Sequence, residues 1–162
     1  MTFRKLSVRM SLLCALAFVV SEAVSAAEPA EALIIVAGTA FPASDISFAA
    51  LKSAFRGQRI TVGGKTIVPI NHPLDSRTRV AFDRVALGLT PEAVGPFWVD
   101  MRIRDQGRPP TTASTPELAI RIASALAGAV TYASPSAPRK WPVKVLTVEG
   151  RAAGQPGYPL NP

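Results

Sequence analysis

The chain has 162 residues, among them 18 Lys or Arg, 11 Asp or Glu, one His and one Cys. Its formal net charge of +7 at pH 7 favours anionic ligands or surfaces, but the excess is too moderate to require nucleic acid as a partner. One cysteine cannot form a disulfide within the chain, and one histidine with scattered carboxylates shows no metal-ligand spacing. We therefore predict neither a metal nor another cofactor.

Residues 1–26 have the pattern of an export signal. Three basic residues lie between positions 4 and 9, and Met10–Val20 is apolar but shorter than the roughly 20 residues of a transmembrane helix. The small residues Val24-Ser25-Ala26 suit a signal peptidase. We predict cleavage after Ala26, secretion into the periplasm and no membrane anchor.

Cleavage would also remove Cys14, the only cysteine, and would leave 15 basic and 10 acidic side chains. A mature chain without cysteine excludes thiol catalysis and thiolate metal sites. Its length suits one domain, predicted over residues 27–150, and the Gly- and Pro-rich tail 151–162 is predicted to be irregular.

The first half of this domain begins with a buried strand. Residues 33–37 (LIIVA) are apolar on both sides, as in a central parallel strand. Ser47 is placed to cap a helix whose apolar residues Phe48, Leu51 and Phe55 share one face, and Gly57 suits its end. Gly63-Gly64 then predicts a tight turn between 59–62 and 66–70.

Around residues 66–82 a short strand opens through a polar turn into a helix. Asp75 or Ser76 can cap this helix, whose core face carries Phe82, Val85, Ala86 and Leu89. Free backbone N–H groups and the helix dipole make such a turn suitable for an anion. The alternative is an ordinary capped strand-to-helix connection that binds nothing.

The second half continues the alternation of helices and strands. Thr90-Pro91-Glu92 starts a helix in which Pro96 predicts a kink or restart, and Trp98 lies at core spacing. Ser114 and Glu117 have capping-box spacing before a helix expected to bury Leu118, Ile122, Ala125 and Leu126. Strands are predicted at 129–133 and 143–148. The order indicates an α/β domain with a mixed or mostly parallel sheet flanked by helices.

Several motifs occur in a fixed order along 33–148. They are the helix 47–57 ending in Phe-Arg-Gly, Val68-Pro69-Ile70 before Ser76-Arg77-Thr78, Leu87-Gly88-Leu89-Thr90, Phe97-Trp98, Gly107-Arg108-Pro109-Pro110, and Gly128-Ala129-Val130-Thr131-Tyr132. In this order they resemble the second lobe of phosphate-type periplasmic substrate-binding proteins of ABC importers. The resemblance implies a single lobe of that fold, a phosphate-like anion as ligand and no enzymatic activity.

The resemblance also implies a binding site in the turn. The family's phosphate turn reads Arg-x-Asp-x-Ser-Gly-Thr, and this chain keeps Ser76 and Thr78 but has His72, Leu74 and Arg77 in place of the arginine, the aspartate and the glycine. Asp75 lies one residue later than the family's acceptor. The predicted ligand-binding residues are Asn71, His72, Asp75, Ser76, Arg77 and Thr78.

Importers of this class hold the ligand between two lobes, and this chain has the length of about one. A lone half-cleft is expected to bind small anions weakly. The expected partners are an ABC permease and a second copy of the chain, since a dimer or a separate protein would complete the site.

Other functions have less support in the residues. With one histidine, Ser76 and Asp75 would have to meet His72 by an accident of folding to form a catalytic triad. Arginines on helix faces are usually solvated, but Arg77 lies in the first turn of its helix, where a cation is unfavourable without an anion nearby. A different class of function also fits: an interaction module of the same fold, without small-ligand binding, that docks a protein partner or an anionic surface through its basic face.

Overall fold

The computed structural model describes residues 31–137 and 140–161, so the predicted signal peptide lies outside the described residues. The strands are β1 (Ile34–Gly38), β2 (Asp45–Ile46), β3 (Thr61–Val62), β4 (Lys65–Thr66), β5 (Val68–Asn71), β6 (Thr111–Thr112), β7 (Ala129–Ala133) and β8 (Val143–Val148). The helices are α1 (Phe48–Phe55), α2 (Arg77–Phe82), the π-helix η1 (Asp83–Leu87), α3 (Pro91–Ile103) and α4 (Pro116–Ala125).

Six strands form one mixed sheet in the order β2-β8-β1-β7-β5-β6. A short hairpin of β3 and β4 lies at the predicted Gly63-Gly64 turn, but most of its predicted second strand, 66–70, belongs instead to β5 of the main sheet. The pairs β2/β8, β5/β7 and β5/β6 are parallel, whereas β1 is antiparallel to both β7 and β8. The predicted mixed, mostly parallel sheet is confirmed, but the parallel direction predicted for 33–37 is wrong. An apolar run reports burial on both faces, and burial does not encode strand direction.

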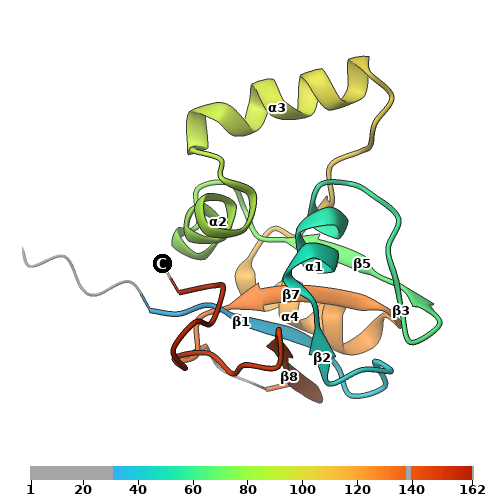
Figure 1. Cartoon of the computed structure of the whole chain (residues 1–162), viewed down its shortest axis with the longest axis vertical. Helices are drawn as coiled ribbons and strands as arrows, with labels where there is room; N and C mark the ends of the chain where they lie inside the picture. Colours follow the sequence, from blue (N-terminus) through green and yellow to red (C-terminus); the bar gives the residue numbers. More distant parts are fainter. Residues whose placement is uncertain (1–30, 138–139, 162) are drawn as a thin grey trace, which may run out of the picture.

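Helices cover both faces of the sheet (Figure 1). Alternate residues of β1 point to opposite sides. Ile35 joins a core with Phe55 of α1 and Phe82 of α2, whereas Val36 packs with Ile120 of α4. Since all of these side chains are buried, the sheet is the middle of three layers.

Helix α1 follows its sequence pattern. The Ser47 hydroxyl accepts a hydrogen bond from the Ala50 N–H, and Leu51 and Phe55 are fully buried. Gly57 has φ +84°, the left-handed conformation expected after a helix end. An added Cβ there would lie 2.5 Å from the Arg108 carbonyl oxygen, so Gly57 also allows the 107–110 loop to approach.

Two helices differ from prediction. The helix beginning at Arg77 changes from α to π geometry at Asp83, where one extra residue per turn is accommodated. Helix α4 is capped by Thr115 rather than Ser114, and it buries Ala119, Ile120 and Ala123. The predicted buried face of α4 is therefore wrong: Leu118 and Ile122 are half-buried, and Ala125 and Leu126 are exposed. The small side chains of Ala119 and Ala123 instead face the sheet and let α4 lie close to it.

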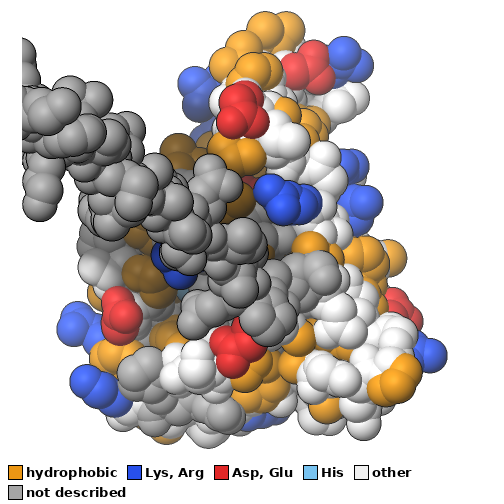
Figure 2. All heavy atoms as spheres, turned by 90° about the vertical axis from the view of Figure 1, so that its left-hand side faces the viewer, with side chains coloured by type: hydrophobic (Ala, Val, Ile, Leu, Met, Phe, Trp, Pro, Cys, Tyr) orange, Lys and Arg blue, Asp and Glu red, His pale blue; other side chains and the backbone are white. Residues whose placement is uncertain are grey.

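Helix α3 is continuous through Pro96, which excludes the predicted restart and leaves the predicted kink untested. It lies apart from the sheet at the top of the molecule (Figure 1) and buries only Val94 and Trp98. Val99 and Ile103 are 60% and 78% exposed, and Figure 2 shows apolar side chains among charged ones on this upper part. Trp98 is buried on the inner side of α3, but it does not belong to the central core.

The C-terminal tail has no helix or strand over its described residues, 151–161, yet it packs on the domain. Tyr158 and Leu160 are buried in the core beside α1. The Tyr158 hydroxyl donates to the Leu33 carbonyl oxygen at 2.8 Å, and the Leu33 N–H donates to that of Leu160 at 3.0 Å. Among the described residues, every helix is too short or too polar to cross a bilayer.

Candidate functional site

The turn between β5 and α2 leaves the sheet at Asn71. Ser76 is the helix cap: its hydroxyl accepts from the Arg79 N–H at 3.2 Å and donates to the Pro73 carbonyl oxygen at 2.9 Å. Within the described residues, the backbone N–H groups of Arg77 and Thr78 have no acceptor. These are two of the orphan donors that every helix start leaves, and here they remain available.

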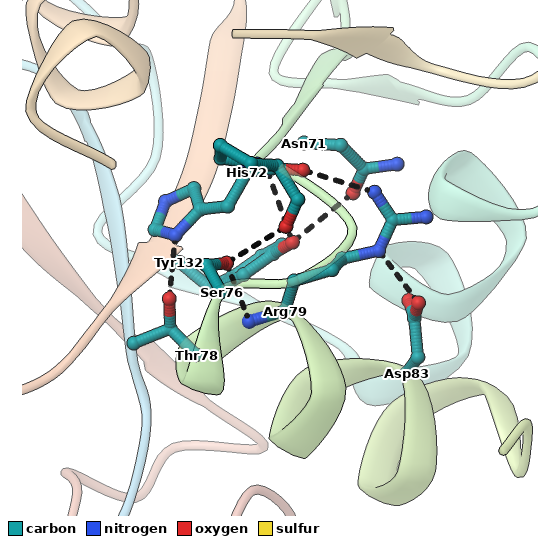
Figure 3. Close-up of polar contacts among 8 residues, drawn as sticks. Asn71, His72, Ser76, Thr78, Arg79, Asp83 and Tyr132 are labelled. Carbon is teal, nitrogen blue, oxygen red and sulfur yellow. Dashed lines mark hydrogen bonds and ion pairs between the residues drawn. The ribbon is translucent and has the colours of Figure 1, made fainter. Parts of the chain in front are cut away.

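An aromatic stack ties this turn to the core, and Figure 3 shows its His72 and Tyr132 members. The ring of Tyr132 stacks on Phe82 with centroids 4.0 Å apart, and the centroid of the His72 ring lies 4.4 Å from that of Tyr132. The Tyr132 hydroxyl donates to Asn71 Oδ1 at 3.3 Å and accepts from the His72 N–H at 3.2 Å. Burial raises the pKa of this phenol, so it stays neutral.

His72 is neutral at physiological pH. Burial, followed by the nearby positive charge of Arg79, lowers its pKa from 6.5 to about 4. Its Nδ1 lies 2.7 Å from Thr78 Oγ1, and its buried Nε2 has no partner in the part of the chain that the structure describes. If Nδ1 carries the proton, it donates to Thr78 Oγ1 and leaves the hydroxyl hydrogen of Thr78 free to donate outward.

Arg79 and Asp83 form a buried ion pair one helical turn apart. Arg79 Nε lies 2.6 Å from Asp83 Oδ2, the two side chains are 3% and 4% exposed, and Arg79 Nη1 donates to the His72 carbonyl oxygen at 3.2 Å. Burial raises the pKa of Asp83, and the Arg79 charge and hydrogen bond oppose that rise. The pair therefore connects the turn to the helical segment, through the bond from Arg79 to the His72 carbonyl oxygen.

The predicted site residues are adjacent in the turn but differ in exposure. Asn71 and His72 are buried, Ser76 and Thr78 are half-buried, and Asp75 and Arg77 are exposed. The Ser76 hydroxyl is occupied by capping, and Asp75 does not cap the helix. A role for these residues in ligand binding stays a prediction.

Sequence reasoning missed three residues that shape the site: Arg79, Asp83 and Tyr132. The expectation that arginines on helix faces are solvated is wrong for Arg79, which is 3% exposed. The spacing of Arg79 and Asp83, which allows an ion pair across one helical turn, was an available signal. Nothing in the sequence placed Tyr132 beside the turn, because that contact depends on the pairing of β5 with β7.

A cavity of about 430 Å³ lies beneath α3, and the Arg79–Asp83 pair forms part of its wall. Its lining includes Asn71, Arg79, Asp83, Val94, Trp98 and Thr112. Of the predicted site residues only Asn71 reaches it. Within residues 31–137 and 140–161, no group of three or more His, Cys, Asp or Glu side chains could hold a metal ion.

Among the comparisons with known proteins, those with solved structures inform the fold. The sequence matches no protein-family model and no curated protein. The structure is similar to an ABC-type phosphate transport receptor from Vibrio cholerae, with TM-score 0.57 and 18% identity over 76% of this chain and 48% of that one. It is also similar to a chain from Clostridium perfringens with bound phosphate, described as a phosphate ABC transporter substrate-binding protein. That match has TM-score 0.57 and 20% identity over 76% of this chain and 47% of the other.

The chain spans about half the length of these solved structures. At such low identity the likeness concerns the fold alone. It confirms the predicted resemblance: the domain has an α/β, periplasmic-binding-protein-like fold of the kind found in phosphate-binding transport proteins.

Proposed function

We propose that this domain is a non-catalytic solute-binding module that binds a small oxyanion at the turn between β5 and α2. The observation that carries the proposal is the set of unused donors at this turn, namely the N–H groups of Arg77 and Thr78 beside the Thr78 hydroxyl. The helical segment that follows is eleven residues long, from Arg77 to Leu87, and its dipole favours negative charge at this end.

Each residue would have a distinct role in this site. Thr78 would donate its hydroxyl hydrogen while neutral His72 donates to its oxygen, and the exposed guanidinium of Arg77 would approach from solvent. Ser76 would hold the turn in shape through its cap, and Asn71 would anchor it through Tyr132. One structural neighbour is a phosphate transport receptor and the other holds bound phosphate, which supports phosphate as the first anion to test.

Replacing Thr78 by valine is expected to weaken phosphate binding about ten- to hundredfold, since a hydrogen bond to a charged ligand contributes about 1.5–3 kcal/mol. Isothermal titration calorimetry of the 27–162 protein measures this effect. Thr78→Ser keeps the hydroxyl and is the matched control, and Arg84→Gln removes an exposed cation farther along the helical segment. Monomer and dimer fractions from gel filtration are titrated separately, because a second copy would complete the half-cleft and raise the affinity.

One result would reject the oxyanion site. If phosphate, sulfate and small organic anions give no heat and leave the melting temperature unchanged, the interaction module without small-ligand binding is the function that remains. Equal affinities for Thr78→Val and Thr78→Ser would instead show that the anion binds elsewhere.

We also propose that the protein is exported through the signal at residues 1–26. The charge and apolar pattern of that segment supports this proposal. Expression of the full chain in a bacterium is expected to yield a periplasmic protein whose intact mass begins at Ala27. A mass that retains Met1 in the periplasmic fraction, or recovery only from the cytoplasm, would contradict it.

A further inference from the structure

Helix α3 carries apolar side chains on two opposite faces. Val94 and Trp98 are buried on its inner face. Pro96, Val99 and Ile103 are exposed, and the exposed fractions of Val99 and Ile103 are 60% and 78%. At 3.6 residues per turn these three side chains fall within about 60° of one another around the helix axis, on the side opposite Val94. We call them the outer stripe.

The outer stripe lies where a helix at the surface of a protein usually presents polar side chains. Helix α3 lies across the top of the molecule in Figure 1, and because its inner face packs on the domain, its outer side faces away from the sheet and the other helices. The spacing of the three residues, i, i+3 and i+7, is that of the seam between two helices packed along their length. A second helix is therefore the element that fits this stripe.

Charges at the two ends of α3 identify that second helix. Glu92 is exposed one turn before Pro96 on the same side, and Arg102 is exposed at the other end. Neither forms an ion pair within the described residues, whereas Arg104 is already paired with Asp100. Glu92 and Arg102 lie about 15 Å apart along the helix axis, which is too far for them to pair within one chain.

A second copy of α3, packed antiparallel, supplies both partners at once. Glu92 of each copy then lies beside Arg102 of the other, and the two helix dipoles are antiparallel, which is favourable. Packed in parallel, the same helices would place Glu92 beside Glu92 and Arg102 beside Arg102. The antiparallel arrangement uses the same surface on both copies, as in most homodimers.

We propose that the outer stripe of α3 is a dimer interface, at which two copies of the chain pack with their α3 helices antiparallel. The contact comprises one 13-residue helix from each copy, which is small for a protein interface. Its Kd should therefore lie in the micromolar range, about 1–100 μM. The interface does not involve the turn between β5 and α2, and its test contains no anion.

Sedimentation velocity of the 27–162 protein from about 1 μM to about 1 mM measures this association. Val99→Lys places a charge in the middle of the stripe and is expected to raise the dimer Kd at least about tenfold. Leu126→Lys is the matched control, because Leu126 is 48% exposed but lies at the end of α4, and it should leave the Kd unchanged. Since both side chains are exposed, the two variants should unfold in urea like the wild type.

Charge reversal tests the ends of the interface. Glu92→Arg places two cations together and is expected to weaken the dimer about three- to tenfold. The double variant Glu92→Arg/Arg102→Glu restores an opposite charge at each end and should recover the wild-type Kd.

Cysteine cross-linking tests the orientation, since the 27–162 protein contains no cysteine. Glu92→Cys mixed with Ile103→Cys should give a mixed disulfide. Either variant alone should cross-link poorly, because like positions in the antiparallel pair lie about 16 Å apart, beyond the reach of a disulfide. The proposal is overturned if the wild type stays monomeric throughout the concentration range, if Val99→Lys dimerises like the wild type, if the double charge variant is no tighter than Glu92→Arg, or if each cysteine variant cross-links with itself as well as with the other.

Discussion

Replacing Arg79 by methionine is expected to lower the free energy of unfolding by about 3–5 kcal/mol, the usual cost of leaving one member of a buried ion pair alone. The change leaves the Asp83 carboxylate without its guanidinium partner, and the other oxygen of that carboxylate is already unpaired. It also removes the donor to the His72 carbonyl oxygen. Since a domain of this size has about 5–15 kcal/mol of stability in total, urea unfolding would detect the loss readily.

The chain contains a matched control for this prediction. Asp100 and Arg104 form a second pair with the same i,i+4 spacing at 2.8 Å, but their side chains are 53% and 61% exposed. Arg104→Met is expected to cost no more than about 0.5 kcal/mol. The double variant Arg79→Met/Asp83→Leu should recover most of the loss, because it leaves no buried charge. Equal costs for Arg79→Met and Arg104→Met would mean that the Arg79–Asp83 pair is hydrated in solution.

Local signals in the sequence were sufficient to predict the positions of most helices and strands. Ser47 and Gly57 delimit α1, and Gly63-Gly64 turns the hairpin, because caps and tight turns depend on residues within one or two turns of chain. The predicted direction of β1 was wrong because strand direction depends on which strands lie beside it, and the residues of β1 alone do not specify those neighbours. The wrong face of α4 was predicted to be buried, because alanine is a weaker hydrophobic signal than leucine or isoleucine. Ala119 and Ala123 face the sheet and allow close approach, whereas Leu118 and Ile122 are only partly buried.

The candidate site was only partly predictable for the same reason. Its turn and its Ser76 cap are local and were found. The contacts that fix it are not local: Tyr132 lies 60 positions from His72, and Arg79 is buried only because α2 packs on the sheet. The cavity depends on where α3 lies relative to β5 and η1, which no periodicity in 91–103 reveals. The sequence pattern thus predicted the turn but not the contacts of Tyr132 and Arg79 that hold it in place.

Acidification is expected to destabilise the domain through His72. Burial lowers the pKa of this imidazole in the folded state to about 4, against 6.5 for the ordinary group. Between these values the unfolded chain binds a proton that the folded protein does not, so stability rises with pH across this window and is constant above it. From pH 7 to pH 4.5, this residue alone should cost about 2–3 kcal/mol.

The variant His72→Gln isolates this contribution, since it retains a hydrogen-bonding group but cannot titrate. Urea unfolding of both proteins at pH 7 and pH 4.5 should show that the wild type loses about 2–3 kcal/mol more than the variant. Asp83 acts in the opposite direction, because its raised pKa favours proton uptake by the folded state, but it is present in both proteins and cancels in the comparison. Equal losses in the two proteins would show that His72 takes up its proton without unfolding the turn, and that its orphan Nε2 reaches solvent or an acceptor once charged.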